Sequence, residues 1–74
     1  MIIEKEVLAY LAQNPNAEDS VEGITRWWLS SSDQYTVAEV QAALDELISR
    51  KLLVARRCPE GHVYFRANLD RRNS

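Results

Sequence analysis

The feature that most constrains this chain is a long amphipathic helix that runs almost without a linker into a β-hairpin. Thr36 and Glu39 have the spacing of a capping box, in which two side chains satisfy backbone amides at a helix start. Apolar residues then recur at intervals of three, four and seven, which predicts a helix over residues 36–51 with one buried stripe. The stripe consists of Val37, Val40, Leu44, Leu47 and Ile48. Thr36 is therefore interpreted first as a helix cap.

The segment after this helix predicts two strands, at about 53–58 and 62–67, joined by a tight turn. Residues 52–54 form a short apolar run, and residues 63–66 show the alternation that is typical of a strand. Pro59 suits the first central position of a type I turn, and Gly61 suits the left-handed position that follows.

Two further helices are expected upstream, at about 2–13 and 20–30. Pro15 ends the first one, because a residue before proline is pushed out of the helical region. Ser20 or Asp19 can cap the second, and the connector at Ala17 and Glu18 can form a single strand bridge. The helix stripe should pack against Val7, Leu11, Ile24 and Trp28, with Phe65 or Val63 covering one side. The sequence thus predicts an α+β, mostly α fold: one domain over residues 1–67, a three-helix bundle with a C-terminal hairpin. Residues 68–74 are expected to form a flexible tail.

This order of elements resembles the winged helix-turn-helix superfamily over about residues 2–67. The resemblance is carried mainly by the runs LDELISRKLL at 44–53 and RRCPEGHVYFR at 56–66. In bacterial regulators of this type, the third helix ends in a leucine-x-x-leucine run, and a basic hairpin, the wing, follows it. Lys51 stands where these regulators usually have a glycine, and a left-handed residue there would carry strain of about 1 kcal/mol. The polar loop at 30–34 is also longer than in a compact helix-turn-helix.

The resemblance implies a DNA-binding, transcription-regulatory protein, with the third helix in the major groove and the wing on the backbone or minor groove. The expected contacts to double-stranded DNA are Arg56, Arg57 and Arg66 in the hairpin, with Thr36 and Gln41 near the helix start. Residues 1–48 hold two basic side chains against nine acidic ones, whereas residues 49–74 hold seven against two. Because DNA affinity comes largely from neutralised phosphates, the contacts are expected mainly from the basic wing.

The acidic helix favours an alternative interpretation, a winged helix that binds protein or a second copy of itself and does not bind DNA. Its exposed side carries acidic residues and no lysine or arginine before Arg50; the acids are Glu39, Asp45 and Glu46. Trp27 falls at the flank of the second helix, where a tryptophan can anchor a protein interface. The simpler interpretation of Trp27 is a half-buried cover over a small core. For Arg56 and Arg57 it is a charged hairpin edge that resists aggregation.

Neither an enzyme nor a metal or cofactor site is expected. Cys58 and His62 flank the turn, but the chain has one cysteine and one histidine, so a zinc site would have to be completed by carboxylates. With only two glycines, the sequence contains no glycine-rich phosphate loop, and no small-molecule ligand is inferred. No apolar run approaches a membrane span, no signal-peptide layout is present, and one cysteine forms no internal disulfide. A cytoplasmic location is therefore expected.

Overall fold

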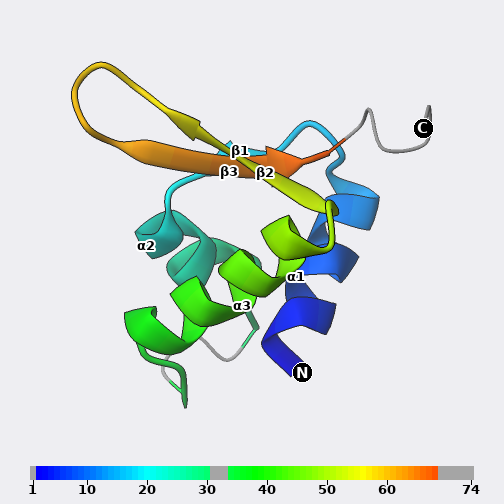
Figure 1. The fold of residues 1–74 in the computed structure, drawn as a ribbon. Coiled ribbons are helices and arrows are strands. Elements are labelled where there is room, and N and C mark those ends of the chain that lie inside the picture. The colour runs from blue at the N-terminus through cyan, green and yellow to red at the C-terminus, as the bar shows by residue number, and fades with distance from the viewer. Residues whose placement is uncertain (1, 31–33, 69–74) are drawn as a thin grey trace.

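The computed structural model describes residues 2–30 and 34–68, and it has the predicted α+β architecture. A small sheet lies over a layer of helices, with the hairpin projecting beyond α2 (Figure 1). The helical elements are α1 (Ile2–Gln13), α2 (Val21–Gly23), the π-helical turn η1 (Ile24–Trp28) and α3 (Val37–Ser49). The strands are β1 (Glu18–Asp19), β2 (Leu53–Arg57) and β3 (Val63–Ala67). This topology is winged-helix-like. The predicted tail lies outside the described residues from 69 onwards, and so does the loop at 31–33.

Helix α3 begins at the predicted capping box. The Thr36 hydroxyl accepts a hydrogen bond from the Glu39 backbone N–H at 3.1 Å, and the Glu39 carboxylate accepts one from the Thr36 N–H at 2.9 Å. Two amides at the helix start are thereby satisfied by side chains rather than by water.

The other end of α3 is a Schellman motif built around a left-handed lysine. The Lys51 N–H donates to the Ile48 carbonyl at 2.9 Å, and the Leu52 N–H donates to the Leu47 carbonyl at 3.0 Å. This pair of bonds requires a left-handed residue at Lys51, which has φ +64°. Helix α3 therefore ends at Ser49 with Arg50 as its C-cap, two residues before the predicted end at 51.

The second helical segment is shorter than predicted. Ser20 caps it, since its hydroxyl accepts a hydrogen bond from the Gly23 N–H at 3.2 Å. The segment passes into a π-turn and ends at Trp28, and the backbone is extended at Leu29, so the predicted end at 30 is wrong. Trp28 and Leu29 are both buried.

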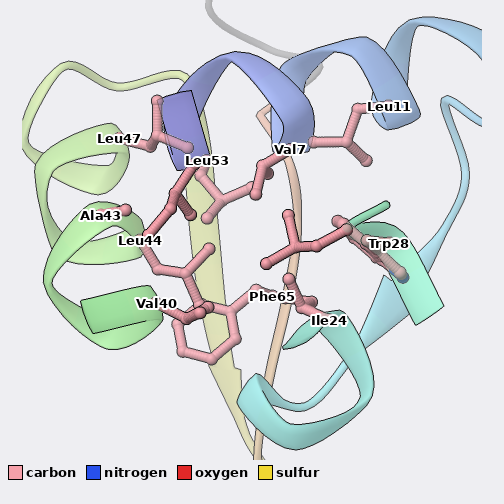
Figure 2. Close-up of a cluster of buried hydrophobic side chains, with 12 residues drawn as sticks. Val7, Leu11, Ile24, Trp28, Val40, Ala43, Leu44, Leu47, Leu53 and Phe65 are labelled. Atoms are coloured by element: carbon pink, nitrogen blue, oxygen red, sulfur yellow. The ribbon is translucent and has the colours of Figure 1, made fainter. Parts of the chain in front are cut away.

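The core lies between the helices and the sheet (Figure 2). Val40, Leu44 and Leu47 of α3 are fully buried, as predicted. They share the core with residues of α1, η1 and both hairpin strands, including Val7, Leu11, Ile24, Trp28, Leu53 and Phe65. The prediction for Val37 was wrong, because this residue is 46% exposed. It lies in the first turn of α3, where it borders an open hollow of about 200 Å³ beside α2 and η1.

The sheet has the order β1-β3-β2, with both pairs antiparallel. The predicted bridge near Glu18 is present: β1 pairs with β3 at Glu18–Arg66 and Asp19–Phe65. At the hairpin tip, the Cys58 N–H donates to the His62 carbonyl at 2.8 Å and the Gly61 N–H donates to the Cys58 carbonyl at 2.9 Å. Gly61 has φ +95°, the left-handed conformation that the turn prediction required. Among the described residues, no helix is long and apolar enough to span a bilayer.

Candidate interaction surface between helix α3 and the hairpin

A hollow of about 460 Å³ lies between α3, the hairpin and the start of α2, and it is here named the α3–hairpin groove. It is lined by Ser20, Val21, Glu22, Gln41, Asp45, Ile48, Ala55, Arg57, Gly61, His62, Val63 and Phe65. Gln41, Asp45 and Ile48 face the groove from one side of α3. The helix-facing side of both hairpin strands forms its roof. The groove exists because the hairpin extends past the helices that cover its base (Figure 1).

The helical walls of the groove carry negative charge. Glu22 projects from α2, and Asp45 projects from α3. The Gln41 side-chain amide donates to an Asp45 carboxylate oxygen at 2.9 Å, which holds that carboxylate beside the groove. The lining also contains apolar side chains, among them half-buried Ile48 and Val63, and the cationic side chain of Arg57. The groove thus offers apolar contact flanked by carboxylates.

The three hairpin arginines predicted to contact DNA lie on opposite faces of the sheet. Side chains alternate along a strand, and Arg57 shares the helix-facing side with buried Leu53, so it lines the groove. Arg56 and Arg66 project from the outer face. Glu18 of β1 lies directly opposite Arg66 on that face. The hairpin therefore does not gather its positive charge on the side that faces α3.

Arg56 is held by a bidentate ion pair with Glu18. Its Nε lies 2.9 Å and its Nη2 lies 2.8 Å from the two Glu18 carboxylate oxygens. These hydrogen bonds hold the pKa of Glu18 below its ordinary value and raise the pKa of Arg56. The guanidinium carbon also lies 5.9 Å from the centre of the Tyr64 ring. Glu18 thereby neutralises the charge of Arg56 and uses two of its five N–H donors, which makes Arg56 a weaker phosphate contact.

The other predicted DNA contacts are likewise only partly available. Thr36 is committed to the α3 cap, and Gln41 is bonded to Asp45. Arg57 and Arg66 are exposed, and within the described part of the chain neither side chain takes part in a hydrogen bond or salt bridge, although the charge of Arg66 helps to lower the pKa of Glu18. The structure therefore brings only Gln41 and Arg57, of the five predicted residues, to the α3–hairpin groove.

The exposed face of α3 is acidic, as predicted from the sequence. Glu39, Asp45 and Glu46 are all exposed, and α3 itself contains no lysine or arginine. Arg50, which caps the helix, lies 2.9 Å from the Glu46 carboxylate and 3.8 Å from that of Glu4. This face therefore offers no unpaired cation to a phosphate.

Trp27 lies outside the core, 69% exposed, whereas Trp28 is buried. The Trp28 ring stacks on Tyr10 with 4.8 Å between ring centres and 12° between planes. Trp27 thus occupies the flank position expected for an interface anchor, and that role remains a prediction. Cys58 is a free thiol at the hairpin tip. In the described ranges, no three Cys, His, Asp or Glu side chains are grouped so that they could hold a metal ion.

Sequence reasoning missed the role of Glu18, which appeared only as part of a connector. Glu18 reaches Arg56 because β1 pairs with β3, and no local sequence pattern encodes a contact across 38 positions. Comparison with family models, with curated proteins and with solved structures gave no match to this chain.

Proposed function

We propose that this chain is a winged-helix domain that binds protein rather than DNA, and that the α3–hairpin groove is its docking site. The observation that carries this proposal is the charge of the surface shared by α3 and the hairpin. Asp45 and Glu22 flank the groove, Arg57 is the one hairpin arginine that lines it, and Arg56 is on the other face and bound to Glu18.

Duplex DNA fits this surface poorly on physical grounds. Affinity for DNA comes largely from basic side chains that neutralise phosphates and release counterions. A helix placed in the major groove would bring Glu39, Asp45 and Glu46 towards the phosphates, with no unpaired cation on the same helix. Protein partners impose no such requirement, because a half-apolar groove with a few fixed polar groups is a common form of peptide site.

The test compares two ligand classes under the same conditions. A mixed-sequence duplex is titrated by fluorescence anisotropy at about 50 and 200 mM salt, the range over which phosphate contacts lose most of their affinity. In parallel, a displayed library of random peptides is selected against the folded domain. We expect peptides that compete for one site and no duplex binding. A variant with Asp45 and Glu46 both changed to Lys serves as a positive control, because removal of the repulsion should produce salt-dependent duplex binding.

Duplex binding by the wild type that weakens steeply with salt and is lost in Arg57→Ala would overturn the proposal in favour of DNA. A selection that yields no peptide specific for the folded domain would overturn it as well.

A second form of protein contact, self-association through Trp27, is favoured by the exposure of that side chain. Tryptophan is enriched at the energetic centres of protein interfaces. Sedimentation velocity over a concentration series should show a dimer for wild type and for Trp27→Phe, and a monomer for Trp27→Ala. A wild type that sediments as a monomer at all concentrations contradicts self-association and leaves the groove proposal intact.

A further inference from the structure

We infer that the partner of the α3–hairpin groove is an extended, lysine- or arginine-bearing segment of another protein that adds as a strand to the free edge of β2. This inference rests on the proposed protein-binding function and specifies its ligand. It is carried by two independent observations, an unpaired sheet edge and a charged groove directly beside it.

The first observation is the orientation of the β2 backbone. In the order β1-β3-β2, strand β2 has a neighbour on one side only. Cys58 and Leu52 both form backbone hydrogen bonds with the residues opposite them, His62 and Asn68. In an antiparallel pair the residues alternate between those that bond to the partner strand and those that face away.

Even-numbered residues of β2 therefore bond to β3, and the odd-numbered residues turn their N–H and C=O groups to the free edge. These are Leu53, Ala55 and Arg57, and the hydrogen bonds found within the described residues leave their backbone groups open. A row of open donors and acceptors of this kind is a template for a further strand.

The second observation is that the same edge borders the α3–hairpin groove, because the Ala55 and Arg57 side chains line it. Side chains of an added strand would alternate between the groove and the outer face of the sheet. A groove-facing side chain opposite Ala55 enters beside Ile48 and Asp45, where a long aliphatic stem and a terminal cation match the surroundings. The position opposite Arg57 favours an acidic or neutral side chain for the same electrostatic reason.

Charge also distinguishes this ligand from a second copy of the chain. Antiparallel pairing of two β2 edges would bring the unpaired Arg57 of both copies into one short ladder, and edge arginines of this kind oppose self-pairing. Within β2, Arg56 is already neutralised by Glu18, so an incoming cationic segment meets unpaired positive charge of this strand at Arg57.

The test uses two seven-residue peptides, acetyl-TTKVETT-amide and acetyl-TTEVKTT-amide, which place Lys and Glu on one face in the two possible strand directions. The control is acetyl-TTQVQTT-amide. Binding and amide hydrogen exchange are followed by NMR on the ¹⁵N-labelled domain. One charged peptide should bind more tightly than the control and should slow exchange of the Ala55 and Arg57 amides. The Val54 and Arg56 amides, which already bond to β3, should be slow before peptide is added.

Two variants test the two observations separately. Asp45→Asn should weaken binding of the charged peptide about two- to fivefold, as expected for a partly exposed ion pair, whereas Glu46→Gln, an equal charge change outside the groove, should not. Ala55→Pro removes an N–H that points out of the sheet, so it should block strand addition while sparing the β2–β3 ladder.

Peptide binding without slower exchange at Ala55 and Arg57, or binding unaffected by Asp45→Asn, would overturn this inference and leave the protein-binding function standing. Slow exchange of these two amides in the peptide-free domain, together with a dimer in sedimentation, would assign the edge to a second copy and also overturn it. If the library selection yields no peptide, both this inference and the proposed protein-binding function fail.

Discussion

Replacement of Lys51 by glycine should stabilise the domain, because Lys51 is the one non-glycine residue with positive φ in the described chain. An L-residue in the left-handed region costs about 1–2 kcal/mol, and glycine avoids this cost. Glycine also gains more conformational freedom in the unfolded chain, which offsets about 0.5–1 kcal/mol. The net gain in the free energy of unfolding should be about 0.5–1 kcal/mol. For a domain of this size that corresponds to a rise in Tm of roughly 2–8 °C.

Thermal and urea unfolding followed by circular dichroism measure this change, and two control variants isolate its cause. Lys51→Ala removes the same charge but keeps a Cβ, so its stability should stay within about 0.5 kcal/mol of wild type. Ala42→Gly places glycine at an exposed position inside α3 and should cost about 1 kcal/mol. A Lys51→Gly variant no more stable than Lys51→Ala would refute the assignment of backbone strain to this position.

Three further changes test the core, the cap and the acid sensitivity of the fold. Leu44→Ala empties a site that is 0% exposed and should lower the free energy of unfolding by about 2–5 kcal/mol, whereas a loss near zero would place α3 out of register. Thr36→Ala removes the α3 cap and should lower the free energy of unfolding in urea by about 1 kcal/mol. An unchanged stability would contradict this and would mean that water replaces the hydroxyl without loss. The pKa of Glu6 is held below its ordinary value of 4.5, first by the Ser30 backbone N–H and then by the Ser30 and Tyr35 hydroxyls. This contribution to stability is complete above pH 4.5 and is lost as the pH falls through the lowered pKa, so unfolding of Glu6→Gln should depend less on pH in acid. Parallel acid profiles for the two proteins would contradict that prediction.

Local features of the fold were predictable because their causes lie within a few residues. The capping box at Thr36 and Glu39 and the turn at Pro59 and Gly61 depend on side chains and backbone angles close in sequence. The left-handed conformation of Lys51 was anticipated only through the resemblance to winged-helix regulators, which usually have a glycine at this position. The buried stripe of α3 also followed from periodicity, apart from its first residue.

The remaining features depend on contacts that periodicity does not encode. Val37 continues the apolar spacing, yet its exposure is decided by how far the other elements extend over the first turn of α3. The second helical segment ends at Trp28, and the Trp28 and Leu29 side chains both reach the core. Glu18 neutralises Arg56 only because β1 joins the sheet beside β3, and the division of the arginines between two faces follows from the strand register.

The most direct test of the claim that the surface between α3 and the hairpin binds protein is one NMR titration of the ¹⁵N-labelled domain at about 50 mM salt, where phosphate contacts are strongest. Mixed-sequence duplex DNA is added to one sample and a library-selected peptide to another, and the shifts of the Asp45, Ala55 and Arg57 amides are followed. We predict that the peptide shifts these three amides and that the duplex leaves them unchanged. Movement of the α3 and hairpin amides with duplex, reversed by added salt, and no movement with peptide would contradict the account.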